Sequence, residues 1–212
     1  MEPSEHKGLE GRSFGAQAFE GLHKIRAFVA VSVSDEARQA VAALESDLRQ
    51  AGADVKWVEP RNIHLTLKFL GDTKTRQLDA ICEALREALR GAPAFEVTLA
   101  GTGTFPPRGP RVRVVWVGAD EGQEGLVDLA RRVEDACALQ GFAKEQRPFS
   151  PHLTIGRVRP GARRLTELSA RVAEARFNPL KVAIDRVNLV RSELSPKGPT
   201  YTVLESFPLE RT

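Results

Sequence analysis

His64-Leu65-Thr66-Leu67 is repeated almost unchanged as His152-Leu153-Thr154-Ile155, 88 residues further along the chain. Each phrase alternates polar and apolar residues, which is the period-two pattern of a β-strand with one buried face. On such a strand the histidine and threonine share one face, and the aliphatic residues pack behind them. Two of the chain's four histidines stand in these phrases. The repeat therefore predicts two similar strands that present two imidazoles and two hydroxyls to one cleft.

The sequence around the two phrases predicts an alternation of strands and helices. Hydrophobic periodicity, caps and Gly/Pro breaks give strands at 25–33, 54–58, 63–70, 95–104, 112–118, 151–158, 179–191 and 200–209, and helices at 35–50, 75–90, 121–140 and 165–175. Gly71-Asp72 is expected to close the first phrase's strand. The order strand, helix, strand, strand, helix occurs in the first half and roughly again in the second. This favours one duplicated α+β domain over two independent domains.

Composition sets broad limits on the class of protein. A chain of 212 residues with 42% hydrophobic residues can build a soluble globular core, and 31 Lys+Arg against 28 Asp+Glu leave a formal charge of only +3. Cys82 and Cys137 fall at apolar positions of predicted helices, so neither a disulfide framework nor a zinc knuckle is expected. No apolar run could span a membrane, and residues 1–24 lack a signal peptide's apolar segment, so a cytoplasmic protein is expected. Residues 1–24 are interpreted as a flexible extension of a single ordered domain over 25–212.

The paired histidines suit acid and base catalysis at a phosphorus atom. A neutral imidazole accepts a proton and a protonated one donates it near neutral pH, so two of them can perform both proton transfers of a phosphoryl displacement. Thr66 and Thr154 point the same way as their histidines, and their hydroxyls can donate to non-bridging phosphate oxygens. Packing alone could explain one such phrase, but two copies on separately predicted strands favour a shared site.

Three further residues are candidate substrate contacts. Arg157 lies at an odd offset from His152 and should point to the opposite face, unless a bulge at Gly156 turns it inward to bind phosphate. Lys68 shares the face of the first phrase's histidine by simple alternation, whereas Phe69 does not. A metal site is the rival use of two histidines, but each phrase has threonine where a carboxylate ligand would be needed, and no third ligand is evident. We therefore expect neither a metal nor a cofactor.

The paired phrases resemble those of the two-histidine (2H) phosphoesterase superfamily, and within it those of the RNA 2′,3′-cyclic phosphodiesterases, formerly named 2′-5′ RNA ligases. The resemblance extends over about 25–209 and includes the contexts Arg26-Ala27-Phe28-Val29-Ala30, His64-Leu65-Thr66-Leu67-Lys68-Phe69-Leu70-Gly71-Asp72 and Phe149-Ser150-Pro151-His152-Leu153-Thr154-Ile155-Gly156-Arg157. It implies a bilobal α+β fold, in which two antiparallel sheets face a central cleft and the helices lie outside.

The resemblance also implies an activity. The expected reaction is metal-independent hydrolysis of an RNA 2′,3′-cyclic phosphate to a 2′-phosphomonoester, with His64 as the proton donor and His152 as the base. The expected partner is RNA with such a terminus, and a monomer that does not bind membranes is expected. Three alternatives stay open: 2′-5′ ligation by the reverse reaction, action on small cyclic nucleotides or 2′-5′ oligonucleotides, and a nucleic-acid-binding module without catalysis.

Overall fold

The computed structural model describes residues 23–107, 111–196 and 198–211. The predicted N-terminal extension over 1–24 lies outside the described residues except for its last two. The first strand begins there, at Lys24.

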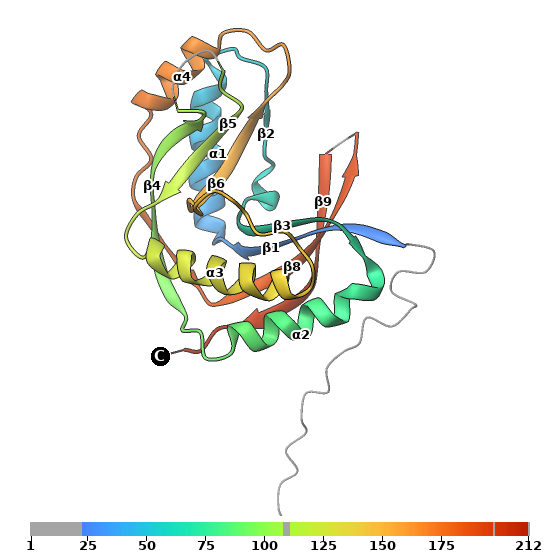
Figure 1. Cartoon of the computed structure of the whole chain (residues 1–212). Coiled ribbons are helices and arrows are strands. Elements are labelled where there is room, and N and C mark those ends of the chain that lie inside the picture. Colours follow the sequence, from blue (N-terminus) through green and yellow to red (C-terminus); the bar gives the residue numbers. More distant parts are fainter. Residues whose placement is uncertain (1–22, 108–110, 197, 212) are drawn as a thin grey trace, which may run out of the picture.

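Strands and helices alternate as the sequence pattern predicts (Figure 1). The strands are β1 Lys24–Ser32, β2 Val55–Trp57, β3 His64–Lys74, β4 Phe95–Phe105, β5 Val114–Ala119, β6 His152–Val158, β7 Leu180–Ile184, β8 Arg186–Ser195 and β9 Gly198–Pro208. The α-helices are α1 Asp35–Arg49, α2 Leu78–Leu89, α3 Gln123–Leu139 and α4 Leu165–Glu174, and short 3-10 helices cover Pro60–Asn62 and Thr75–Gln77. No helix in the described ranges is both long enough and apolar enough to cross a membrane.

The strands form one curled antiparallel sheet with the order β7-β4-β5-β6-β3-β1-β8-β9, and β2 pairs with β6. The expectation of two separate sheets therefore differs from what is observed. The junction is narrow, however, because β3 and β6 pair only at Leu65 and Leu153, and both leucines are fully buried. The sheet can bend at this one pair, so its two ends form the two arms seen in Figure 1.

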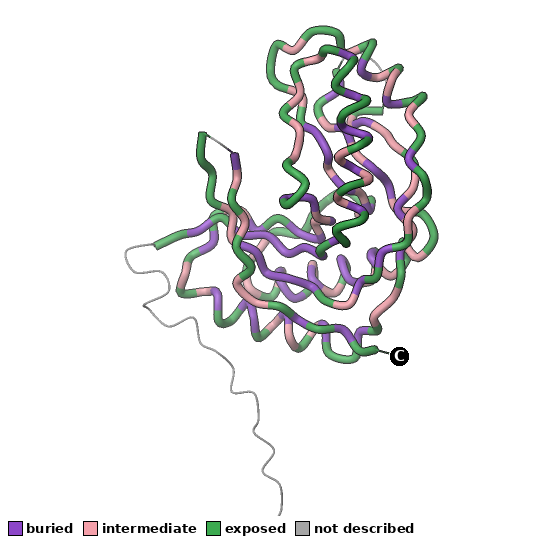
Figure 2. The backbone as a smooth tube through the Cα atoms, turned by 180° about the vertical axis from the view of Figure 1, so that it is seen from behind, coloured by how far each residue is buried: buried purple, intermediate pink, exposed green. Residues whose placement is uncertain are grey.

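Each arm takes helices from both halves of the sequence. Helix α3, from the second half, packs on α2 and β3, whereas α1, from the first half, packs next to α4. The buried residues lie where the helices meet the sheet (Figure 2). The apolar stripe of α2 is buried throughout: Leu78, Ile81, Cys82, Leu85 and Leu89. Both cysteines are free and buried, as expected for core positions.

Two predicted boundaries are wrong for the same physical reason. The predicted strand at 179–191 is divided at Asp185, because β7 pairs with β4 at one end of the sheet and β8 pairs with β1 in the other arm. Strand β3 does not end at Gly71, which takes a positive φ of 66° inside the strand while pairing with Ala27. In both places the partner strand decides the boundary, and local sequence does not reveal the partner.

Candidate active site

The Leu65–Leu153 pair places the two His-Thr phrases side by side at the centre of the sheet. Continuing this antiparallel register by one residue in each direction sets His64 opposite Thr154 and Thr66 opposite His152. All four side chains are half-buried and alternate with the buried aliphatic residues. Residues diagonally opposite on neighbouring strands lie about 7–8 Å apart, so the two imidazoles can reach one phosphate-sized group.

Both imidazole rings are oriented by the same backbone interaction. The Nδ1 of His64 lies 2.7 Å from the carbonyl oxygen of Asn62, and the Nδ1 of His152 lies 2.7 Å from that of Ser150. A carbonyl oxygen only accepts hydrogen bonds, so Nδ1 must carry the proton in both rings. The atom left to gain or lose a proton is therefore Nε2 in each case.

Aromatic side chains hold the two rings in place. Phe28 stacks on His64 at 4.7 Å between ring centroids, and Tyr201 meets the same ring edge-on at 5.2 Å. His152 is met edge-on by Phe105 at 5.0 Å. This packing limits rotation of the imidazoles, and it also removes part of their hydration.

The surroundings of both histidines lower their pKa. Burial is the largest cause, because it disfavours the charged imidazolium. The hydrogen bond to the backbone carbonyl opposes this shift, and the nearby Arg157 guanidinium adds to it by repulsion. Both histidines are therefore poised to lose a proton more readily than an exposed histidine.

A bulge in β3 changes the position of Lys68. Between the pairs Ala30–Thr66 and Val29–Lys68 the register shifts by one residue, which leaves Leu67 without a partner on β1. Lys68 is consequently buried at 3% exposure, and its Nζ lies 2.8 Å from Glu134 Oε1 on α3. The prediction that Lys68 shares the face of the histidine is wrong, because the bulge reverses the alternation.

The same bulge turns Phe69 toward the cleft, where alternation did not place it. Phe69 is 60% exposed, lines a pocket next to the two phrases, and its ring centroid lies 6.2 Å from that of Phe28. Strand β6 has a matching irregularity, since the register against β5 shifts between Gly156 and Thr154. The unpaired residue is Ile155 rather than Gly156, where the bulge alternative was predicted, and Arg157 lines the same pocket as Phe69. Phe69 and Arg157 are each the fifth residue after a phrase histidine.

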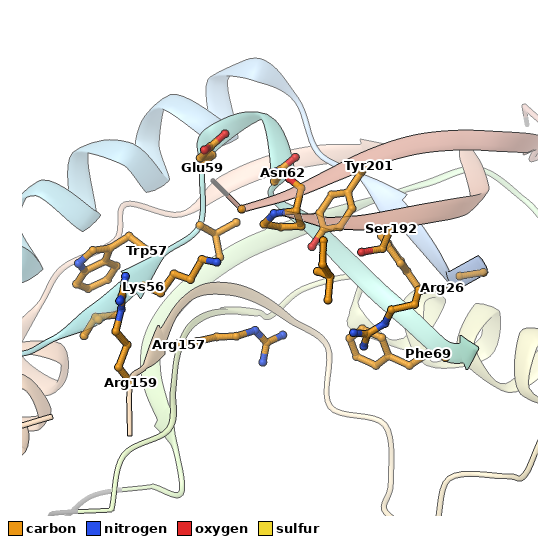
Figure 3. Close-up of a pocket in the computed structure, with 18 of the residues that line it drawn as sticks. Arg26, Lys56, Trp57, Glu59, Asn62, Phe69, Arg157, Arg159, Ser192 and Tyr201 are labelled. Carbon is orange, nitrogen blue, oxygen red and sulfur yellow. Dashed lines mark hydrogen bonds between the residues drawn. The ribbon is translucent and has the colours of Figure 1, made fainter. Parts of the chain in front are cut away.

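A pocket of about 720 Å³ adjoins the histidine pair through Phe28, Asn62 and Tyr201, and Figure 3 draws most of the residues that line it. It is lined by the three residues that neighbour His64, namely Phe28, Asn62 and Tyr201, and also by Arg26, Ala27, Arg49, Val55, Lys56, Trp57, Val58, Glu59, Phe69, Gly71, Arg157, Arg159, Ser192, Leu194, Gly198 and Pro199. The histidines and threonines of the two phrases are not part of this lining. The pocket therefore adjoins the phrases and offers room for the rest of a ligand whose reacting group lies between the histidines.

Sequence reasoning missed the structural roles of Phe28, Asn62 and Tyr201. Asn62 is buried and its Nδ2 donates to the carbonyl oxygen of Pro199 at 3.0 Å, which ties the loop before β3 to the start of β9. Burial raises the pKa of the Tyr201 hydroxyl, although Arg157 and Arg26 oppose the shift. That hydroxyl can therefore act as a donor at neutral pH. Tyr201 is the chain's single tyrosine, but no motif connects it with the histidines.

The described residues contain no group of three or more His, Cys, Asp or Glu side chains arranged to hold a metal ion. The hydrogen-bond donors of the site instead comprise two imidazoles, two hydroxyls and a guanidinium. This set suits an anion and proton transfer rather than a cation.

Comparison with known proteins places these features in a family. Residues 55–196 match the sequence profile of the 2′-5′ RNA ligase superfamily. The RNA 2′,3′-cyclic phosphodiesterase of Methanothermobacter thermautotrophicus is 41% identical over 189 residues, which cover 88% of this chain and 100% of that protein. The protein of the same name from Thermotoga maritima is 34% identical over 186 residues, which cover 88% of this chain and 96% of that protein.

Solved structures agree with the sequence comparison. A Thermus thermophilus protein superposes with a TM-score of 0.71 at 32% identity, covering 87% of this chain and 98% of that chain. Escherichia coli LigT complexed with NADP+ superposes with a TM-score of 0.68 at 27% identity, covering 89% of this chain and 99% of that chain. The chain therefore belongs to the 2′-5′ RNA ligase superfamily, within the family of RNA 2′,3′-cyclic phosphodiesterases.

Proposed function

We propose that this protein hydrolyses RNA 2′,3′-cyclic phosphate ends to 2′-phosphomonoesters by paired-histidine catalysis without a metal ion. The observation that carries the proposal is the matched presentation of His64 and His152. Their rings lie on adjoining strands, and each has Nδ1 fixed to a carbonyl oxygen, which leaves Nε2 for proton transfer. The family relatives bear the name of this reaction.

In the proposed reaction each histidine moves one proton. His152 Nε2 accepts a proton from water as the water oxygen bonds to phosphorus, and His64 Nε2–H donates a proton to the ribose O3′ as the P–O3′ bond breaks. The products are a free 3′-hydroxyl and a 2′-phosphate. Thr66, Thr154 and Arg157 can stabilise the negative charge that builds on the non-bridging oxygens. The reverse sequence of steps, with a 5′-hydroxyl in place of water, is the corresponding ligation.

The direct test uses a short RNA that ends in a 2′,3′-cyclic phosphate, incubated with purified protein in EDTA. The expected product is the 2′-phosphate, identified by its resistance to an enzyme that removes only 3′-phosphates. Formation of the 3′-phosphate would contradict the assigned leaving oxygen. Activity only after a metal ion is added back would contradict the metal-free mechanism, and no turnover under any condition would contradict the proposed function.

The pH dependence of kcat/KM should be bell-shaped, with both limbs at lower pH than ordinary histidines would give. Activity falls at high pH as His64 loses the proton it must donate, and at low pH as His152 gains one. Because burial and Arg157 lower both pKa values, the optimum is expected below about 6.5, the usual histidine pKa. Initial rates between pH 4.5 and 9 check this, and a rate that only rises across the range would contradict it.

Arg157→Gln supplies a matched control for the pH assignment. Removing the guanidinium removes a charge that repels both imidazoliums, so the pKa of each histidine should rise. Both limbs of the kcat/KM profile should therefore move to higher pH, and the maximum rate should fall because a phosphate contact is lost. A profile that is lower but unshifted would show that Arg157 acts on the substrate alone.

A further inference from the structure

The main pocket carries far more positive charge than one cyclic phosphate requires. Five cationic side chains line it, against the single carboxylate of Glu59, which gives the lining a formal charge of +4. The entire chain of 212 residues carries only +3. Glu59 is moreover paired with Arg61 at 2.6 Å, so its charge is already compensated. A cyclic phosphate diester has a single negative charge, and Arg157 beside the histidines is sufficient to meet it.

The surplus cations form a row that leads away from the histidines along β6. Lys56 on β2 is the cross-strand partner of Arg157, so the two side chains share one face. Arg159 follows two residues later, where its backbone N–H donates to the carbonyl oxygen of Asp54 at 3.0 Å and continues the same ladder. Residues two apart on a strand are spaced by about 6.6 Å and point the same way. Figure 3 places Lys56 and Arg159 together, on the far side of Arg157 from Arg26 and Phe69.

These cations are available to a ligand. Among the described residues no carboxylate lies within ion-pair distance of Lys56 or Arg157. Arg159 lies 3.4 Å from Asp54, and both of these side chains are more than half exposed, so water and salt weaken that pair. By contrast, Arg49 at the same end of the pocket is engaged, since it lies 5.4 Å above the ring of Trp57 and 3.6 Å from Glu45.

We infer that Lys56 and Arg159 form a subsite for the phosphodiester backbone of the RNA chain upstream of the terminal nucleotide. The inference rests on the proposed function and extends it from the reacting end to the strand behind it. A groove that carries cations at regular spacing follows a single-stranded backbone without reading its sequence. The protein should consequently prefer oligonucleotide ends to cyclic mononucleotides, because a mononucleotide has no phosphate to place in the row.

The test compares two substrates with a charge-removing double variant, Lys56→Gln/Arg159→Gln. Its kcat/KM should fall about tenfold for an octanucleotide ending in a 2′,3′-cyclic phosphate, and less than twofold for a 2′,3′-cyclic mononucleotide. Both side chains are exposed, so their removal should leave the fold intact. Lys74→Gln/Arg176→Gln removes two exposed cations outside the pocket lining and should change neither value. Asp54→Asn removes the carboxylate that pairs with Arg159, and it should raise kcat/KM for the octanucleotide.

A binding measurement separates failure of this subsite from failure of the proposed function. Fluorescence anisotropy with a labelled octanucleotide carrying a 2′-phosphate reports affinity without turnover. For a single strand the slope of log K against log salt changes by about 0.7 for each phosphate contact, so the double variant should have a slope shallower by about 1.4. An unchanged slope, equal losses on both substrates, or no advantage of the octanucleotide would overturn the inference. Inorganic triphosphate could also compete with the RNA in a way that depends on Lys56, while affinity does not increase with RNA length. That result would assign the row of cations to a polyphosphate and would overturn the inference as well.

Discussion

His64→Ala and His152→Ala are each expected to lower kcat for an RNA 2′,3′-cyclic phosphate by about 10²- to 10⁴-fold, with a much smaller change in KM. Each variant lacks one of the two proton transfers, while the threonines and Arg157 remain to bind the phosphate. The double variant should be little worse than either single variant, because the two transfers belong to one displacement. Single-turnover rates at saturating enzyme measure the chemical step directly.

His23→Ala is the matched control for these two variants. His23 is exposed and directly precedes β1, at the end of that strand opposite to Ser32, which pairs with His64, and its replacement should leave the rate unchanged. A loss of less than tenfold in either phrase variant, with the fold intact by circular dichroism, would show that the corresponding imidazole is not a proton-transfer group.

Lys68→Met is expected to destabilise the protein by about 3 kcal/mol rather than to weaken substrate binding. The Lys68 ammonium is buried between Glu134 Oε1 at 2.8 Å and the carbonyl oxygen of Ala143 at 2.9 Å. Removing it leaves a largely buried carboxylate without its counter-ion, which is costly in a protein interior. Glu134 keeps the backbone N–H of Glu145 at 2.8 Å, but a neutral donor compensates only part of the charge. Urea unfolding monitored by tryptophan fluorescence measures the change.

A double variant separates the cost of an unpaired charge from the value of the pair. Lys68→Met/Glu134→Met replaces both charges with apolar groups of similar size, and its stability should lie within about 1 kcal/mol of the unmodified protein. Both variants should keep KM for the RNA substrate at temperatures where they are folded. If Lys68→Met were fully stable but raised KM tenfold, Lys68 would bind phosphate and its ion pair would be incidental.

The contrast between Lys68 and the histidines shows what local sequence can predict here. The alternation in each His-Thr phrase predicted correctly which residues are buried and which are half-buried, because burial alternates through all four residues and changes only after the bulge at the fourth. The apolar stripe of α2 and the cap of α1 at Ser34 are predictable for the same reason. At this cap the backbone N–H of Ala37 donates a hydrogen bond to Ser34 Oγ at 3.2 Å. Each depends only on residues within one or two turns.

Features that depend on a distant partner strand were not predictable. The bulge at Leu67 is defined by the register against β1, and it exchanges the faces of Lys68 and Phe69. A bulge in β6 could be anticipated only as an option at Gly156, and the residue that is left unpaired is its neighbour Ile155. A bare Cα at Gly156 is needed for another reason, because a Cβ there would lie 2.7 Å from Val55 Cγ1 and about 3 Å from the ring of Trp57. Phe28 reaches His64 through the pairing of β1 with β3, and Tyr201 reaches it through the pairing of β9 with β8 and of β8 with β1. No spacing in the sequence reveals these pairings.

The proposed mechanism requires that both histidines act on a single phosphorus atom. A crystal structure of the protein with an RNA 2′-phosphate product tests this requirement most directly. We expect the Nε2 atoms of His64 and His152 both to lie within about 2.6–3.2 Å of oxygen atoms at the reacting centre, the former next to the ribose O3′ and the latter next to a phosphate oxygen. A phosphate held by one imidazole alone, with the other turned away or out of reach, would contradict the mechanism.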